Sequence, residues 1–452
     1  MVLTKIIIMK IAFLPIDNRP VCYTLPEIIA SIDENIEFSI PERNLLGDLK
    51  HIANIDGLFD WLKKLPPQDV IIISLDTLIY GGLIPSRKGN ETIDELKSRL
   101  EILKQILKEK NAKIYATSSI MRISNNNYNE EEKEYWAQYG KKIFEYSYNL
   151  HKYSNAKTDV PNEIIDDYLK TRNRNFEINK IYLQWEKEGL FETLVFSKDD
   201  CAQYGLNVKE AQELQKMGGF IKTGADEIPL SLLARALNKK MKIYPKFLES
   251  DYKNLISNYE DISIEASVKG QIELAGCEFC PDEHSADLIL YVNNFKDNQG
   301  EIVMKINTQN FEGKFVPAKK PYIIADVRFA NGSDNAFVKE LFKNKLDDKY
   351  FYGYSGWNTT ANTLGSLICG AKFKYFAGRY NCENFNKLQI TRFLDDWAYQ
   401  ANVRQMLKKA DENELAILMK EFEPIIFDVL KTKMDVKYSY PWNRLFEVEV
   451  WI

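Results

Sequence analysis

Histidine is the scarcest chemically useful residue in this chain, with three in 452 residues: His51, His151 and His284. None follows a predicted strand, so a Ser-His-Asp triad and a multi-histidine zinc site are both disfavoured. Six cysteines in so long a chain form no evident disulfide framework, which is typical of reduced thiols in the cytoplasm. Cys277 and Cys280 precede His284 closely, but a fourth zinc ligand is missing, so we favour a surface loop there.

Other missing patterns disfavour further classes of protein. The chain has 60 Lys and Arg against 65 Asp and Glu, and a net charge of -5 offers no basic surface for nucleic acid. No segment approaches the roughly twenty apolar residues that span a bilayer, and Lys5 and Lys10 interrupt the apolar N-terminal stretch, which lacks a signal-peptide cleavage site. No glycine-rich nucleotide-binding turn or phosphate loop occurs, so no cofactor is expected.

We therefore expect a cytoplasmic protein that acts on a small molecule or an oligosaccharide and uses neither nucleic acid nor a membrane. The sequence carries no signal of its oligomeric state.

Short apolar runs that end on polar residues recur along the chain. Near-continuous apolar runs predict strands that are covered on both faces, as in a parallel sheet between helices. An amphipathic stretch such as 92–110, with leucines at helical spacing, predicts the helices between them. The runs are 10–16, 69–75, 112–118, 193–198, 219–224, 288–292, 321–325 and 350–355.

This alternation of strand and helix predicts an α/β fold. We expect a (β/α)8-type barrel with a helical C-terminal extension, although about ten strand candidates exceed the eight of one barrel. Two doubly wound lobes are the alternative. The expected division is an α/β catalytic domain over residues 1–385, with a helical insertion at 129–190, and a helical extension over 386–452.

The most informative run, 193–198, ends on two adjacent carboxylates, Asp199 and Asp200. Neighbouring like charges repel unless one group keeps its proton, and a carboxyl group protonated near neutral pH is what a general acid needs. A helix cap with a solvated neighbour is the simpler alternative. Because ligands bind at the carboxyl ends of parallel strands, and other strand ends are polar too, we interpret the pair as catalytic.

Polar residues at the other strand ends are candidates for substrate binding. The glycine pair after Tyr80 allows close approach to a ligand, and Arg87 can clamp an anionic or hydroxyl-bearing group. Trp357 beside Asn358 offers an apolar face and a hydrogen-bonding edge that suit a sugar ring. Glycine turns and helix caps explain the same residues without a ligand. The candidates are Asp17, Arg19, Asp76, Tyr80, Arg87, Arg122, Asp226, Glu227, Asp326, Asn331, Trp357, Asn358 and Asn362.

Several motifs together resemble an uncharacterised bacterial family, domain of unknown function 4127. The resemblance spans nearly the whole chain and implies no activity. Its motifs are Asp17-x-Arg19-Pro20, Leu45-Leu46-Gly47-Asp48, Ser74-Leu75-Asp76 through Tyr80-Gly81-Gly82, Lys198-Asp199-Asp200 through Tyr204-Gly205, Gly224-Ala225-Asp226-Glu227, Ala330-Asn331-Gly332, the specific Gly356-Trp357-Asn358-Thr359, and Asp395-Asp396-Trp397.

The strand followed by Asp199 and Asp200 is also similar to the site of the O-GlcNAcase-type β-N-acetylhexosaminidases. These are barrel enzymes in which the substrate's acetamido group is the nucleophile. The similarity implies that Asp199 orients the acetamide and that Asp200 is the acid/base.

We therefore expect a glycoside-hydrolase-like enzyme that acts on a sugar, N-acetylated if the local similarity holds, by carboxylate chemistry without a metal. One alternative is a divalent-metal-dependent hydrolase or transferase in which Asp17, Asp76 and Asp326 are oxygen ligands. The other is a non-catalytic protein whose carboxylates bind sugar hydroxyl groups.

Overall fold

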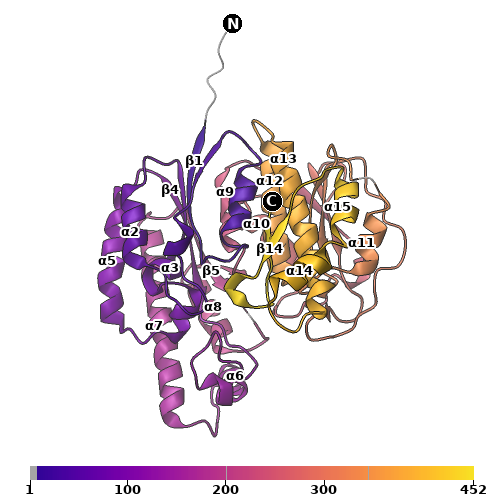
Figure 1. Ribbon diagram of the computed structural model, residues 1–452. Coiled ribbons are helices and arrows are strands. Elements are labelled where there is room, and N and C mark those ends of the chain that lie inside the picture. Colours follow the sequence, from indigo (N-terminus) through magenta and orange to yellow (C-terminus); the bar gives the residue numbers. More distant parts are fainter. Residues whose placement is uncertain (1–7, 200, 345) are drawn as a thin grey trace.

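Two open parallel sheets organise the part of the chain that the computed structural model describes, residues 8–199, 201–344 and 346–452 (Figure 1). The first has the spatial order β2 (Ile36–Ser39), β1 (Met9–Leu14), β3 (Val70–Ser74), β4 (Lys113–Ile120), β5 (Thr193–Lys198) and β6 (Phe220–Thr223). The second has the order β13 (Phe351–Ser355), β11 (Tyr322–Asp326), β9 (Leu288–Asn293), β7 (Lys242–Phe247) and β8 (Glu278–Phe279).

Both sheets follow the same winding rule. Counted from its own first strand, each sheet begins with the order 2-1-3-4-5, so the chain reverses direction across the sheet beside that strand. The α/β fold with parallel sheets is as predicted. The described residues form no closed sheet, and the (β/α)8 barrel is not confirmed. The reason is that β7 pairs with β8 and β9 instead of extending the first sheet beyond β6.

The strands are buried on both faces because helices cover both sides of each sheet. In β3, Ile71 and Ile73 face an outer core, whereas Val70 and Ile72 face an inner one. The outer core is closed by α2 (Ile55–Lys64), α5 (Ile93–Glu109) and α7 (Asn162–Lys187). The inner core continues through α9 (Ile228–Ala236) and α12 (Thr360–Phe376), which pack on each other, into the second sheet. The two lobes therefore share one apolar core.

Helix α5 shows how local sequence sets an element. Thr92 caps its first turn by accepting a hydrogen bond from the backbone N–H of Glu95, whose own carboxylate binds the N–H of Thr92. Leu96, Leu100 and Leu103 then recur on the buried face. The helix predicted over 92–110 is confirmed almost to the residue.

The long connection between β4 and β5 contains α6 (Trp136–Tyr153) and α7, which extend to the lower edge of Figure 1. The second half of α7 covers the first sheet, while its first half forms a small separate core with α6, around Trp136 and Tyr168. None of the described helices combines the length and the apolar character needed to cross a membrane.

The remaining elements connect and flank the two sheets. Those of the first lobe are α1 (Thr24–Ala30), α3 (Leu75–Tyr80), α4 (Leu83–Lys88) and α8 (Leu206–Lys216). Those of the second are α10 (Ile264–Leu274), α11 (Asn335–Leu341), α13 (Cys382–Arg392), a π-helix (Phe393–Gln400), α14 (Glu412–Met419) and α15 (Glu423–Leu430). Two small ladders pair β10 (Gly300–Glu301) with β12 (Phe329–Ala330), and β14 (Lys437–Ser439) with β15 (Glu449–Trp451).

Asp326 ends β11 and ties three segments of the second lobe together. Its buried carboxylate accepts hydrogen bonds from Asn293 Nδ2 at 2.8 Å, from the Asp334 backbone N–H at 2.9 Å and from the Tyr354 hydroxyl at 3.0 Å. Burial, reinforced by the neighbouring Asp334, raises the pKa of Asp326 to about 7. The side chain thus holds the ends of β9 and β13 and the start of α11 in place.

We predict that Asp326→Asn destabilises the protein, because an amide presents only one acceptor oxygen to these three donors. The free energy of unfolding should fall by about 2–4 kcal/mol in denaturant titrations. Asp94→Asn, on the exposed side of α5, is the matched control and should stay within about 0.5 kcal/mol of the wild type. Coinciding unfolding curves for the wild type and Asp326→Asn would contradict this role.

Candidate functional site

A cavity of about 510 Å³ lies where the carboxyl ends of both sheets meet. The first lobe contributes residues that follow β1, β4, β5 and β6, and the second contributes residues that follow β12 and β13. A C-terminal segment, residues 440–447, crosses from the second lobe to complete the wall. The lining residues are Asp17, Arg19, Leu83, Ile84, Arg87, Arg122, Ser124, Asn126, Tyr128, Glu130, Glu131, Asp199, Asp226, Tyr259, Asn331, Asn358, Thr359, Asn362, Trp442, Arg444 and Phe446.

The cavity brings together most of the residues that the sequence singles out. Asp200 lies outside the described residues. The candidates found in the wall are Asp17, Arg19, Arg87, Arg122, Asp199, Asp226, Asn331, Asn358 and Asn362. The candidates that are buried elsewhere and do not line the cavity are Asp76, Tyr80, Glu227, Asp326 and Trp357.

Asp76 lies away from the cavity because α3 begins immediately at the end of β3, within the segment expected to be a strand end. Its carboxylate turns back to the sheet, where it accepts hydrogen bonds from the Ser119 backbone N–H at 2.8 Å and the Ser118 hydroxyl at 3.4 Å. Burial raises the pKa of Asp76 to about 6. Tyr80, at the end of the same helix, packs under the guanidinium of Arg174.

Trp357 and Glu227 do not line the cavity, although their sequence neighbours Asn358 and Asp226 do. Trp357 is only 2% exposed and contacts the ring of Phe446, which itself lines the cavity. Glu227 is buried behind Asp226, and burial raises its pKa strongly. The tryptophan that reaches the cavity is Trp442 instead.

The floor of the cavity is an ionic cluster around Arg19. Its Nε is 2.9 Å from Asp17 Oδ2, its Nη2 donates to Asp226 Oδ1 at 2.6 Å, and its Nη1 donates to Glu447 Oε1 at 3.1 Å. The central carbon of the guanidinium lies over the ring of Trp442, 5.1 Å from the ring centroid. The three carboxylates raise the pKa of Arg19 although burial opposes the shift, so the arginine stays charged.

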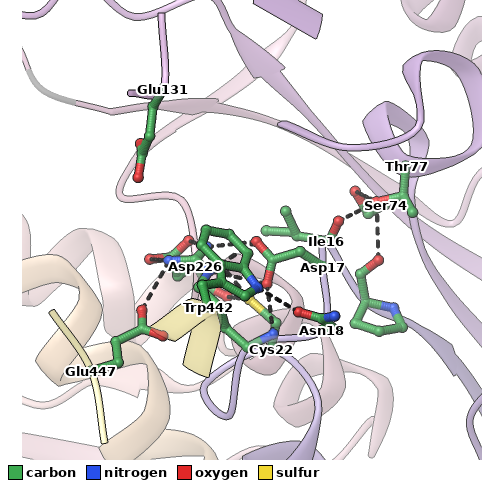
Figure 2. Close-up of polar contacts among 12 residues, drawn as sticks. Ile16, Asp17, Asn18, Cys22, Ser74, Thr77, Glu131, Asp226, Trp442 and Glu447 are labelled. Atoms are coloured by element: carbon green, nitrogen blue, oxygen red, sulfur yellow. Dashed lines mark hydrogen bonds and ion pairs between the residues drawn. The ribbon is translucent and has the colours of Figure 1, made fainter. Parts of the chain in front are cut away.

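Two neighbours hold this floor in position. Thr77, in α3, donates its hydroxyl proton to the Ile16 carbonyl at 2.7 Å and so holds the segment that carries Asp17 (Figure 2). Trp442 donates from Nε1 to Asn18 Oδ1 at 2.6 Å, which attaches the C-terminal segment to the first lobe.

A second ionic cluster surrounds Glu131 on the opposite side of the cavity. Its carboxylate lies 2.9 Å from Arg122 Nη2, 2.8 Å from Arg444 Nη1 and 3.5 Å from Arg87 Nη2. Burial opposes ionisation, but the three guanidinium groups lower the pKa of Glu131 well below its usual range. Arg122 also reaches Asp199, with 3.5 Å between Nη1 and Oδ2. The Asp199 side chain is 20% exposed and faces the cavity.

The second lobe contributes amide groups on strained turns. Asn331 and Asn358 both have left-handed backbone, with φ of 58° and 67°, and the Asn331 N–H donates to the Asn358 carbonyl at 3.2 Å. Thr359, not Asn358, caps α12 by accepting from the Asn362 N–H. The capping alternative is therefore wrong for Asn358, whereas Asp334 does cap α11.

Sequence reasoning missed Glu131, Trp442, Arg444, Phe446 and Glu447. None follows a strand of either sheet, so the strand-end pattern carries no signal for them. The available signals were the acidic run that contains Glu131 and the aromatic and basic residues of the C-terminal tail.

The proposed metal ligands do not meet. Asp17 is paired with Arg19, while Asp76 and Asp326 are buried at other places in the fold. Across residues 8–199, 201–344 and 346–452, no group of three or more His, Cys, Asp and Glu side chains is arranged to hold a metal ion.

The Arg19 cluster predicts a dependence of stability on pH. Burial, reinforced by Asp226 and Asp17, raises the pKa of Glu447 from 4.5 to about 7 although Arg19 opposes the shift. The protonated carboxyl therefore stabilises the fold fully below pH 4.5, and this contribution is lost as the pH rises through 7. Glu447→Gln, which mimics the protonated form, should reduce the loss of stability between pH 5 and 8 by about 1–3 kcal/mol.

Melting temperatures across this pH range measure the effect. Asp94→Asn should follow the wild-type curve in parallel. An equally steep decline in Glu447→Gln and the wild type would show that Glu447 does not titrate in this range.

Comparison with known proteins supplies the family but no activity. No curated protein matches the sequence, so no curated relative supports the local similarity to O-GlcNAcase-type enzymes. A family model described as "Protein of unknown function (DUF4127)" matches residues 11–451. The match spans both sheets and every residue that lines the cavity. The chain therefore belongs to the DUF4127 family, as the motifs of its sequence predicted.

Proposed function

We propose that the cavity binds a sugar-like ligand and that the protein is a glycoside-hydrolase-like enzyme. The observation that carries this proposal is the mixed polar lining, in which guanidinium, carboxylate, amide and hydroxyl groups of both lobes surround about 510 Å³. Each hydroxyl group of a sugar can donate to a carboxylate and accept from a guanidinium or an amide.

The aromatic residues of the C-terminal segment fit the same ligand. Trp442 and Phe446 add aromatic surface to a wall in which Leu83 and Ile84 are the aliphatic residues. Sugar rings present C–H groups on one face and hydroxyl groups at the edge, so they bind where an aromatic ring lies beside polar groups. We assign to Trp442 the part that the sequence suggested for Trp357.

The proposed chemistry uses Asp199 and Asp200. Asp199 faces the cavity at the end of β5, and the guanidinium of Arg122 at 3.5 Å stabilises its charged form. An ionised Asp199 suits the group that orients the substrate's acetamide. Asp200 would then donate a proton to the leaving group and take one from water.

The non-catalytic alternative uses the same lining to bind a sugar without turnover. No observation within the described ranges favours the metal-dependent alternative. Its three aspartates, Asp17, Asp76 and Asp326, each contact different partners at different places in the fold. A direct assay separates these possibilities.

We predict that the purified protein hydrolyses one or more members of a panel of 4-nitrophenyl glycosides that includes N-acetylated sugars. Asp199→Asn should lower kcat by about 100-fold or more, because the group that aligns the acetamide loses its charge. Asp94→Asn is the control and should keep the wild-type rate. Release of 4-nitrophenolate measures turnover, and circular dichroism checks folding.

Two outcomes would contradict parts of this proposal. Folded wild-type protein that binds sugars but turns over no glycoside would support the binding protein. A wild-type rate in Asp199→Asn would remove this residue from the chemistry.

The two aspartates should also differ. Asp200→Asn should slow alkyl glycosides far more than aryl glycosides, because an activated aryl leaving group needs little protonation, whereas Asp199→Asn should slow both alike. Exhaustive chelation should leave the wild-type rate unchanged. Loss of activity that magnesium, manganese or zinc restores would instead favour the metal-dependent enzyme.

A further inference from the structure

Arg87 is a buried arginine whose side chain donates no hydrogen bond within the described part of the chain. It lies on α4, lines the cavity and is only 2% exposed. Its Nε and Nη2 are buried without a hydrogen-bond partner. The nearest carboxylates are at ion-pair distance only, with Glu131 at 3.5 Å from Nη2 and Glu132 at 3.7 Å from Nε. Unused donors on a buried guanidinium cost free energy.

Two other buried arginines, Arg172 and Arg328, donate hydrogen bonds from several of their guanidinium nitrogens. Arg172 donates to both oxygens of Glu210 at 2.7 Å and to the Met121 carbonyl at 2.7 Å. Arg328 donates to an asparagine, a backbone carbonyl and Glu249.

Arg392, which lies away from the cavity, also leaves Nε and Nη1 without a partner among the described residues, but its Nη2 donates to Asp395 at 3.0 Å. The Arg87 side chain, by contrast, makes no hydrogen bond to any residue of 8–199, 201–344 or 346–452. The donors of Arg87 are left available at the wall of the cavity.

The carboxylates near Arg87 are shared with other arginines, since Glu132 also pairs with Arg122. Burial and the neighbouring guanidinium of Arg122 lower the pKa of Arg87, although Glu132 and Glu131 act in the opposite direction. Glu131 cannot neutralise Arg87 alone, since it is shared with Arg122 and Arg444. A ligand oxyanion beside Arg87 would accept the hydrogen bonds that these shared carboxylates do not accept.

The turn before α4 places these groups at the cavity. Gly81 and Gly82 have φ of 83° and 136°, which other residues adopt only with strain. This turn separates α3 from α4, so that Leu83, Ile84 and Arg87 of α4 line the cavity while Tyr80 of α3 stays buried.

We propose that Arg87, together with Arg122 and Arg444, binds an oxyanion of the substrate, a carboxylate or a phosphate, so that the substrate is an acidic sugar. The sugar part of this inference rests on the proposed function; the oxyanion part rests on Arg87 alone. Guanidinium groups bind such oxyanions through paired, charge-assisted hydrogen bonds.

A ligand-binding role and a structural role predict opposite effects on the free protein. Arg87→Met removes a buried charge whose side chain makes no hydrogen bond, and its partners Glu131 and Glu132 keep their pairs with Arg122. The melting temperature without ligand should therefore stay within about 2 °C of the wild type. Arg172→Met breaks the pair with Glu210 and should lower it by several degrees. A similar loss in Arg87→Met would assign this residue to the structure and overturn the proposal.

The binding test uses isothermal titration of the full chain with glucose, glucuronate, glucose 6-phosphate and inorganic phosphate. We expect glucuronate or the phosphates to bind at least 10-fold more tightly than glucose. Arg87→Met should lose at least 10-fold of that affinity, and Arg87→Lys should lose less because it keeps the charge. Arg379→Met, at a side chain that is 69% exposed, is the control. A response to glucuronate alone identifies a carboxylate, and a response to both phosphates identifies a phosphate.

The outcomes for the two proposals are distinguishable. If no acidic probe binds, or if Arg87→Met binds as the wild type does, the oxyanion site is overturned even if neutral glycosides are hydrolysed. If acidic probes bind through Arg87 and no glycoside is hydrolysed, the oxyanion site stands and the glycosidase proposal fails.

Discussion

The charge balance at Arg19 is the constraint on which both the fold and the cavity depend. Asp17 follows the first strand, Asp226 follows the last strand of the same sheet, and Glu447 comes from the segment that crosses from the second lobe. A buried guanidinium is tolerated only because these carboxylates surround it, and they are tolerated only because it is there. Loss of the arginine would leave three buried acids without this counter-charge, and would remove one of the contacts that hold the C-terminal segment to the first lobe.

Part of the site could be predicted because parallel strands end at a common edge. Asp17, Arg122 and Asp199 follow β1, β4 and β5, and the register of these strands places the residues on one side of the sheet without further information. The same rule failed for Asp76 because α3 starts one residue after the strand and turns its side chain inward. An apolar run in the sequence does not show, to within one residue, where a strand ends and the following helix begins.

The partner of a strand could not be predicted in the same way. The sequence of β7 is equally suited to a strand that extends the first sheet and to a strand that begins a second one. Its actual pairing with β8 and β9 depends on segments that are distant in the sequence. The ionic contacts between lobes are equally invisible: Arg444 and Glu131 are 313 residues apart, and Arg19 and Glu447 are 428 apart. Residues that meet only after both lobes have formed leave no local pattern.

The apolar core that passes through α9 and α12 has a consequence for how a ligand enters. Two-lobed proteins often close on a ligand by bending at a hinge, which requires an interface that can separate. Here separation would expose the contact between α9 and α12 to water. The lobes should therefore hold a nearly constant distance, and the cavity should exist in the same form before and after binding. A preformed cavity of this kind loses little conformational entropy when a ligand binds. It therefore selects ligands whose shape matches the cavity of the free protein.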